Sequence, residues 1–339
     1  MNVKQRHILI IRISALGDIA IAAPLIKEYA CKNPGIRFTV VSQKMVEPLF
    51  DSVENLHFEP VNFKPGKMDA LTVAGFARSL LRLRPTEVAD IHDVPRSRII
   101  RYYLWLHGIP YRKICKNRKR KKELTRRRNK MLVPLKTSQR SYEEVLVALG
   151  LEDLQFACRP AEPLRKVKSP FRRIGIAPFA KHPGKQWPLE YMEEVVARLG
   201  EDPDNKIVLF GGGKEQTEIL RSWESKYPHT ESAAGKYTLK EELEFIKGLN
   251  VMISMDSANM HFASVVRTPV ISIWGSTHPY GGFYGWGQDP ANIIQLDLPC
   301  RPCSVFGNRK CFRSDRPYEC MRDITPRQVL DKITEVIHG

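Results

Sequence analysis

The sequence predicts an α/β fold built from two parallel β-sheets, each covered by helices. Short apolar runs alternate with helical segments from the start of the chain, and the alternation begins again after residue 167. Such apolar runs are typical of strands buried on both faces of a parallel sheet. A length of 339 residues also exceeds the usual size of a single core. We therefore expect two domains, 1–165 and 166–325, and a terminal helix over 326–339.

The first half of the chain contains four strand signals and four helix signals. Several of the expected helices end at proline or glycine, which cannot continue a helix without cost. The expected strands are His7–Ile13, Arg37–Val41, His57–Val61 and Glu87–His92, and the expected helices are Ile19–Cys31, Met68–Leu83, Arg96–Leu106 and Tyr142–Leu149.

An irregular, proline-containing stretch, Phe156–Val167, is the predicted linker between the domains. After it the alternation predicts a second series, closed by a helix that begins at Thr325-Pro326, with threonine as N-cap and proline at the first helical position. The expected strands are Arg173–Ala177, Lys206–Phe210, Val251–Met255 and Val270–Trp274, and the expected helices are Leu189–Leu199, Glu215–Ser225, Leu239–Leu249 and Met260–Val266.

The positive charge is concentrated in one segment. The net charge is +17, and Arg112–Lys130 contains twelve Lys or Arg residues against a single acidic residue, Glu123. A patch of this kind favours an anionic partner, which could be nucleic acid, an acidic membrane surface or a phosphorylated substrate. A solvated loop without a specific partner is the alternative. Aromatic residues that would stack on bases are not interleaved in Lys116–Lys130.

The N-terminal residues predict a first β-strand and not a signal peptide, because the apolar segment after His7 is short and is closed by Arg12. The sequence also lacks an apolar run of the ~20 residues that a membrane-spanning helix needs. We expect a cytoplasmic protein.

Four of the seven cysteines are clustered: Cys300, Cys303, Cys311 and Cys320. Disulfides are rare in the cytoplasm, so bound metal or free thiols are the alternatives. Four thiolates in this spacing are typical of a tetrahedral zinc site, whereas reduced thiols packed in a loop would need no metal. A zinc ion with four cysteine ligands would be structural, because it has no open position for chemistry.

The loop after the first strand is the first candidate site. It reads Arg12-Ile13-Ser14-Ala15-Leu16-Gly17-Asp18, and Pro24 follows. Ligands of such sheets bind beyond the carboxyl ends of the strands. Gly17 permits a tight turn, and Asp18 either caps the next helix or acts on a ligand. The loop has neither the Gly-x-Gly-x-x-Gly pattern of dinucleotide-binding folds nor a P-loop.

Three motifs together resemble the ADP-heptose:lipopolysaccharide heptosyltransferase family. They are the Arg12–Asp18 loop followed by Pro24, Lys185-Gln186-Trp187-Pro188, and Asp256-Ser257-Ala258-Asn259-Met260-His261. The resemblance implies a GT-B fold, in which two Rossmann-like domains face each other across a cleft. It implies that residues 1–165 bind the acceptor and residues 166–325 bind the nucleotide sugar. It also implies an inverting reaction that requires no cofactor.

The resemblance also implies roles for individual residues. Asp18 is the expected general base, which deprotonates the acceptor hydroxyl. The expected acceptor contacts are Ser14, Gly17 and Arg96. The expected donor contacts are Lys185 at the diphosphate, Asp256 at the sugar, Ser257, Ala258 and Asn259 at the start of a helix that binds the diphosphate, Glu215 at the ribose and Tyr237 at the adenine. Lys181 stands where the family usually has a small or hydroxyl residue near the phosphates, and its charge could take the place of that hydroxyl.

The function implied is transfer of a heptose from ADP-heptose onto an inner-core sugar of an anionic glycolipid, a lipopolysaccharide precursor. With such an acceptor, the basic segment is expected to bind the anionic cytoplasmic face of the inner membrane, and no nucleic acid is expected. Two alternatives remain: a GT-B transferase that uses another nucleotide sugar, and a basic, non-catalytic protein that binds nucleic acid or membrane.

Overall fold

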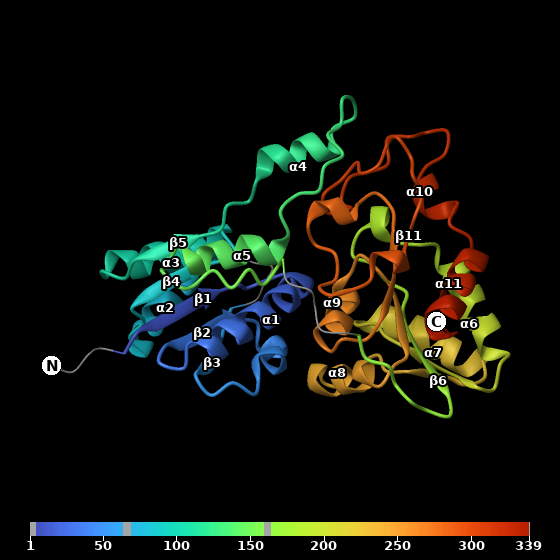
Figure 1. Cartoon of the computed structure of the whole chain (residues 1–339), viewed down its shortest axis with the longest axis horizontal. Helices are drawn as coiled ribbons and strands as arrows, with labels where there is room; N and C mark the ends of the chain where they lie inside the picture. The colour runs from blue at the N-terminus through green and yellow to red at the C-terminus, as the bar shows by residue number, and fades with distance from the viewer. Residues whose placement is uncertain (1–4, 64–68, 159–163, 339) are drawn as a thin grey trace. The chain divides into compact units, whose positions relative to one another are not determined.

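The computed structural model describes residues 5–63, 69–158 and 164–338. The chain forms two compact units, each with its own parallel sheet (Figure 1). The first unit contains Met1–Lys116 and Lys136–Arg159, and the second contains Asn117–Leu135 and Pro160–Gly339. Residues 1–4, residues 159–163 of the predicted linker, and Met68 at the predicted helix start lie outside the described residues.

The first unit has a five-stranded sheet in the order β3-β2-β1-β4-β5, and every neighbouring pair is parallel. Leu9 and Ile11 of the central strand pack with apolar residues of α2 and α3 in a core that excludes water. The strands are β1 (His7–Ile11), β2 (Arg37–Ser42), β3 (Leu56–Pro60), β4 (Glu87–Asp90) and β5 (Tyr111–Lys113), and the α-helices are α1 (Leu16–Lys32), α2 (Ala70–Leu80), α3 (Pro95–Leu106) and α5 (Ser138–Val147).

The second unit has a six-stranded parallel sheet in the order β11-β10-β9-β6-β7-β8. Its core includes two tryptophan side chains, Trp187 and Trp223. The strands are β6 (Arg172–Ala177), β7 (Asn205–Leu209), β8 (Thr230–Ser232), β9 (Val251–Met255), β10 (Val270–Trp274) and β11 (Ile293–Gln295). The α-helices are α4 (Arg118–Thr125), α6 (Leu189–Gly200), α7 (Lys214–Lys226), α8 (Leu239–Lys247), α9 (Ala258–Val265), α10 (Glu319–Arg322) and α11 (Pro326–His338).

Short 3₁₀ helices fill several connections: η1 (Lys44–Phe50), η2 (Leu81–Leu83), η3 (Pro183–Lys185), η4 (Pro279–Gly281) and η5 (Pro290–Asn292). The expected α/β alternation is confirmed, and most expected elements begin and end within a few residues of their predicted bounds. The short edge strands β8 and β11 were not predicted, because three residues are too few for a periodic pattern to be recognised.

The basic stretch, for which no helix was predicted, contains helix α4, Arg118–Thr125. Lys, Arg, Glu and Leu are all strong helix formers, and the buried Leu124 and Thr125 fix one side of the helix. The segment also groups with the second unit, although it lies within the part of the sequence that forms the first. Over the described residues, we find no helix with the length and apolar character needed to span a bilayer.

Candidate functional site

The buried side chain of Arg12 organises the loop that follows β1. Its Nη1 donates a hydrogen bond of 2.9 Å to the carbonyl oxygen of Ile91, and its Nη2 forms an ion pair with Oδ2 of Asp18. The guanidinium carbon also lies 5.5 Å from the centroid of the Tyr142 ring. One guanidinium therefore joins the loops after β1 and β4 to helix α5.

Asp18 is the third residue of α1, and Ala15 occupies the N-cap position. The alternative role of Asp18 as an N-cap residue is therefore not what the structure shows. Its side chain is 38% exposed, so a substrate can reach the carboxylate while Arg12 orients it. The Tyr142 hydroxyl donates to Oδ1 across 3.5 Å, and burial raises the pKa of that phenol, so it stays protonated as a donor.

The loop after β4 is shaped around the buried carboxylate of Asp90. Its Oδ1 accepts the backbone N–H groups of His92 and Asp93, at 2.9 and 2.8 Å. Its Oδ2 accepts the Ser97 hydroxyl at 3.0 Å and pairs with Nη1 of the buried Arg101 at 2.7 Å. A buried carboxylate needs such partners, and here they also fix the backbone that presents His92.

His92 connects the two loops. Its Nδ1 lies 3.3 Å from the backbone N–H of Ile13, and its Nε2 lies 3.4 Å from Ser14 Oγ. Burial, aided by the nearby cations Arg12, Lys116 and Arg96 and opposed by Asp18, lowers the pKa of His92 to about 3. The ring is neutral at pH 7, and because Nδ1 accepts from Ile13, the proton is on Nε2 and is donated to Ser14. The hydroxyl hydrogen of Ser14 can then be directed at a ligand.

The first unit therefore brings several predicted residues together. Ser14, Gly17 and Asp18 are half-buried on one short segment after β1. Arg96, the second residue of α3, is close enough to lower the pKa of His92 and lies 6.0 Å from the Phe63 ring. These groups surround the carboxyl ends of β1 and β4, which are neighbours in the sheet.

In the second unit, Lys185 and Asp256 form an ion pair. Lys185 ends η3 in the loop after β6, and Asp256 directly follows β9, the strand beside β6. Lys185 Nζ lies 2.7 Å from Asp256 Oδ2, and the side chains are only 14% and 4% exposed. The sheet therefore brings together two predicted donor residues that are distant in the sequence.

The stem of Lys185 is held by a close packing contact. Gly307 has φ +76°, and a Cβ atom at this position would lie 2.5 Å from Lys185 Cγ. Glycine is therefore required there for both its backbone conformation and its size. Lys185 Nζ also lies 5.6 Å from the centroid of the Phe283 ring.

Helix α9 begins beside Asp256. Ser257 is its N-cap residue, with Oγ 3.0 Å from Ser254 Oγ, and Ala258 and Asn259 start the first turn. The N–H groups of a first helical turn have no partner within the helix and carry partial positive charge, which suits a phosphate group. The other predicted donor residues are exposed on three separate segments: Lys181 in the loop after β6, Glu215 in the first turn of α7, and Tyr237, whose ring centroid lies 4.5 Å from that of Phe245.

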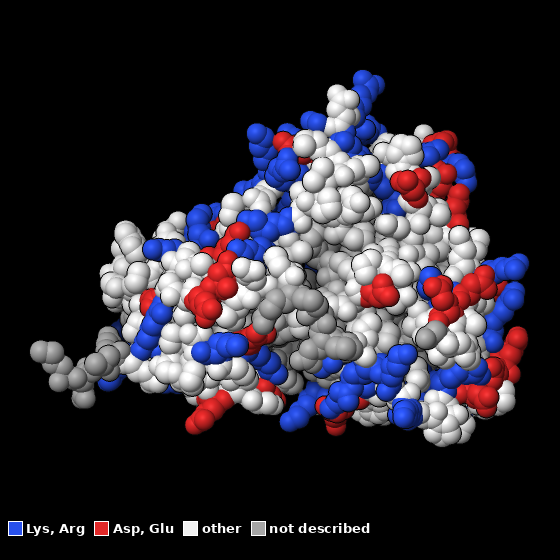
Figure 2. Space-filling model, viewed as in Figure 1, with Lys and Arg blue, Asp and Glu red and all other residues white. Residues whose placement is uncertain are grey.

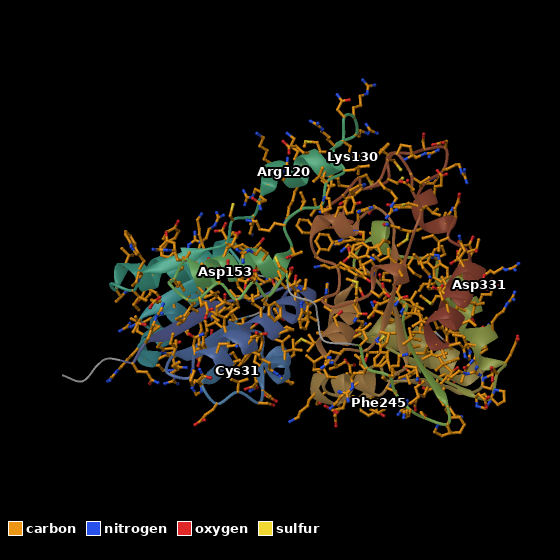
Figure 3. All side chains as sticks on the ribbon, viewed as in Figure 1. Cys31, Arg120, Lys130, Asp153, Phe245 and Asp331 are labelled. Atoms are coloured by element: carbon orange, nitrogen blue, oxygen red, sulfur yellow. The ribbon has the colours of Figure 1, made fainter. Side chains whose placement is uncertain are left out.

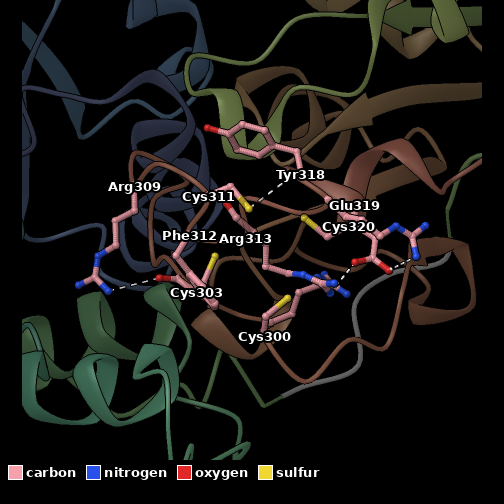
Figure 4. Close-up of a pocket in the computed structure, with 12 residues that line it drawn as sticks. Cys300, Cys303, Arg309, Cys311, Phe312, Arg313, Tyr318, Glu319 and Cys320 are labelled. Carbon is pink, nitrogen blue, oxygen red and sulfur yellow. Dashed lines mark hydrogen bonds and ion pairs between the residues drawn. The ribbon is translucent and has the colours of Figure 1, made fainter.

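The four clustered cysteines line one small pocket (Figure 4). All are free thiols, and the backbone N–H of Tyr318 donates to Cys311 Sγ at 3.3 Å. Burial raises the pKa of Cys303, and it raises that of Cys320 to about 12. Within the described part of the chain, no three His, Cys, Asp or Glu side chains are grouped so that they could hold a metal ion.

Several residues of these sites had no predicted role. Arg12 stands inside the first quoted motif and His92 ends the expected strand Glu87–His92. A charged or titratable side chain at the carboxyl end of a predicted strand is a signal that could have identified both. Tyr142, Phe283 and Gly307 reach their sites from distant segments, and no local pattern points to them.

A family model described as glycosyltransferase family 9 (heptosyltransferase) matches residues 117–311. Lipooligosaccharide heptosyltransferase 2 of Campylobacter jejuni is 25% identical over 168 residues, which are 48% of this chain and 51% of that protein. The chain therefore spans about half the length of the curated relatives that it matches.

Two solved structures share the fold over almost the whole chain. The glycosyl transferase family 9 protein of Veillonella parvula has a TM-score of 0.71 at 18% identity, covering 100% of this chain and 99% of its own. The ADP-heptose lps heptosyltransferase II of Escherichia coli has a TM-score of 0.68 at 18% identity, covering 98% of each chain. The predicted GT-B fold and the predicted family resemblance are both confirmed.

We predict that His92 makes folding pH-dependent. Its folded-state pKa of about 3 lies below the unfolded value of about 6.5, so between these values only the unfolded chain binds the proton. The free energy of unfolding should therefore fall as the pH drops below about 6.5, by about 1.4 kcal/mol per pH unit from this group. His92→Asn keeps an acceptor for Ile13 but does not titrate.

Urea unfolding at pH 7, 6, 5 and 4.5 measures this effect. The decline in unfolding free energy should be shallower in His92→Asn than in the wild type by that amount. His92→Gln, whose side chain reaches toward Ser14 instead of Ile13, should show the same shallower slope. Parallel pH curves for wild type and both variants would contradict the prediction.

Proposed function

Because the chain belongs to glycosyltransferase family 9 (heptosyltransferase), we propose that it transfers a heptose from ADP-heptose to an inner-core sugar of an anionic lipopolysaccharide precursor. The observation that carries the proposal is the Asp18 carboxylate, which is accessible to solvent beyond the carboxyl end of β1 and is oriented by the buried Arg12. The Escherichia coli protein of the same fold is an ADP-heptose lps heptosyltransferase, which supports ADP-heptose as the donor.

In the proposed reaction, the acceptor oxygen bonds to the anomeric carbon of the heptose. The bond from that carbon to the distal phosphate oxygen of ADP breaks, and the electron pair leaves with ADP. The hydroxyl proton moves to the Asp18 carboxylate, which acts as general base. A single displacement of this kind inverts the anomeric carbon.

The residues of the second unit would stabilise the leaving ADP. Lys185 supplies a positive charge where negative charge develops on the diphosphate, and Asp256 holds the ammonium group in place. The N–H groups at the start of α9 would bind a phosphate oxygen. Glu215 and Tyr237 would contact the ribose and the adenine, Lys181 would add charge beside the phosphates, and Ser14, Gly17 and Arg96 would bind the acceptor.

The acceptor also bears on where the protein works. A lipopolysaccharide precursor is carried in the membrane, so we propose that the enzyme acts in the cytoplasm and binds peripherally to the anionic face of the inner membrane. The excess of Lys and Arg in residues 112–130 supports this proposal, because each engaged cation contributes about 1 kcal/mol at such a surface. Nucleic acid is not an expected partner.

A structural zinc ion bound by Cys300, Cys303, Cys311 and Cys320 remains a separate proposal. The shared pocket and the N–H donor to Cys311 support it, since thiolate ligands commonly accept such hydrogen bonds. In the part of the chain that the structure describes, the four thiols are not arranged as a set of metal ligands. Zinc binding would therefore require them to move closer together. No catalytic step depends on this ion.

We predict that Asp18→Asn lowers kcat by about 10²–10⁴-fold, the usual effect of losing a general base. The asparagine oxygen can still accept from Arg12, but the buried guanidinium loses its anionic partner, so the melting temperature should fall modestly while ADP binding is nearly unchanged. Turnover is measured with saturating ADP-heptose and lipid acceptor. Asp153→Asn is the matched control, because Asp153 is an ion-paired aspartate of the same unit that contacts Arg140. Activity of Asp18→Asn within about threefold of the control would remove Asp18 from the mechanism.

We predict that Lys185→Gln weakens ADP binding by about 10–100-fold, which corresponds to a lost bond to a charged group. It should also destabilise the unit by about 3–5 kcal/mol, because the buried Asp256 carboxylate loses its cation. Adding Asp256→Asn should restore most of the stability without restoring ADP affinity, and this separates the two effects.

Thermal shift with ADP, UDP and GDP measures both quantities, because a ligand stabilises the native state according to its affinity. The wild type should prefer ADP. Equal stabilisation by the three nucleotides would contradict an adenine-specific donor site, and a double variant that binds ADP like the wild type would contradict the role of Lys185.

For the cysteine cluster, we predict about one zinc per chain after purification without chelator, measured by elemental analysis with iron determined in parallel, since both metals accept four thiolates. Titration of thiols in the folded protein should then show the four cysteines protected until chelator is added. A metal content below ~0.2 atoms per chain would mean that the four cysteines are packed thiols and not metal ligands.

A further inference from the structure

The basic segment, defined as residues 117–135, is anchored on the cysteine-rich loop, defined as residues 300–312. Lys130 Nζ donates to the carbonyl oxygens of Cys300 and Pro302, at 2.7 and 3.0 Å. Lys121 Nζ lies 5.9 Å from the Phe306 ring centroid, and the Arg127 guanidinium lies 4.1 Å from that of Phe312. These contacts make the basic segment part of the folded surface of the second unit.

Most cations of the basic segment, Arg127 among them, are exposed to solvent. The segment has nine Lys or Arg residues and one acidic residue, Glu123, which pairs with Arg120. Lys and Arg dominate the surface over α4 and the turn after it (Figure 2), and their side chains, including the labelled Arg120, extend outward (Figure 3). The exposed cations are Arg118, Lys119, Arg120, Lys122, Arg126, Arg127 and Arg128.

Apolar side chains are exposed beside these cations. Met131, Leu132 and Val133 are consecutive and are 39%, 52% and 47% exposed. Phe306 and Phe312 of the cysteine-rich loop are also exposed, at 58% and 41%. An exposed group of large apolar residues next to dense positive charge is unusual on a protein that has no partner for it.

The combination of these side chains favours one class of partner. Cations bind the headgroups of an anionic bilayer, while neighbouring apolar side chains enter the boundary between headgroups and acyl chains. A nucleic acid would use the cations, but it would leave the aliphatic Met131, Leu132 and Val133 in water. Phe306 and Phe312 also each have a cation over the ring, where a base would have to stack.

We infer that the basic segment and the exposed Met131, Leu132, Val133, Phe306 and Phe312 form one docking surface for an anionic phospholipid bilayer. The cations contact lipid phosphates, and the apolar residues enter the interfacial layer. The inference rests on the proposed function only in that the acceptor is carried by a membrane. Beyond the Lys and Arg residues of the proposed membrane contact, the inference adds the exposed apolar side chains, which the net charge does not predict.

Co-sedimentation with vesicles tests the inference, with phosphatidylcholine alone compared with a mixture containing phosphatidylglycerol, at low and high salt. The wild type should bind only the mixed vesicles, and less at high salt. Arg118→Gln/Lys119→Gln/Lys122→Gln should lower the partition coefficient by about 100-fold, since each engaged cation contributes about fivefold. Leu132→Ser/Val133→Ser should lower it by about tenfold with the salt dependence unchanged, because its charge is that of the wild type.

The matched control is Arg198→Gln/Arg221→Gln/Arg327→Gln, which removes three exposed charges elsewhere in the second unit. Its partition should stay within about threefold of the wild type, because separated charges are screened within about 10 Å. ADP thermal shifts should be unchanged in all three variants. A wild type that binds these vesicles but shows no ADP preference would support the docking surface while contradicting the proposed donor.

Three outcomes would overturn the inference. An equal loss of vesicle binding in the control and in Arg118→Gln/Lys119→Gln/Lys122→Gln would mean that binding depends only on the net charge of the protein. Wild-type partition of Leu132→Ser/Val133→Ser would remove the apolar half of the surface. Tighter binding to polyuridine than to the mixed vesicles at the same salt, unaffected by Leu132→Ser/Val133→Ser, would assign the surface to nucleic acid.

Discussion

The parallel pairing of the strands is the constraint on which the candidate sites of both units depend. When neighbouring strands run the same way, the loops that follow them emerge at one edge of the sheet. The pairing of β1 with β4 brings the Asp18 loop beside the His92 loop, and the pairing of β6 with β9 brings Lys185 beside Asp256. In each unit, the backbone hydrogen bonds between strands therefore bring the functional loops together, and side-chain contacts then orient the functional groups.

Buried charges then fix the loops at these edges. Asp90 has no exposed surface, so its carboxylate must be satisfied within the protein, and its partners include the backbone of the loop that carries His92. Arg12 acts in the same way on Asp18. A loop held by such bonds loses little further entropy when a substrate binds, because its conformation is already ordered. Burial of His92, aided by the nearby Arg12, lowers the pKa of this ring, so it remains neutral near the proposed base.

The cysteine-rich loop connects features that are separate in the sequence. Its carbonyl groups and aromatic rings hold the basic segment, and Gly307 of the same loop packs against the stem of Lys185. Arg301, between two of the cysteines, donates to the carbonyl oxygens of Thr277 and Gly275 in the loop after β10. The conformation of this loop is therefore linked physically both to the proposed membrane surface and to the proposed donor lysine, and a metal bound by its thiols would stabilise both.

The sequence by itself determined the α/β alternation, the family and the motifs. Each of these is visible in a short stretch of the chain, as a pattern of apolar residues or as a motif that follows a predicted strand. It could not show that the basic stretch forms α4 on the second unit, since that depends on contacts with residues 300–312, about 180 positions away. It also could not show that the Tyr142 hydroxyl contacts Asp18 or that Gly307 packs against Lys185. Only the tertiary structure decided these, because contacts between segments distant in the chain arise from packing and leave no pattern in the sequence near either partner.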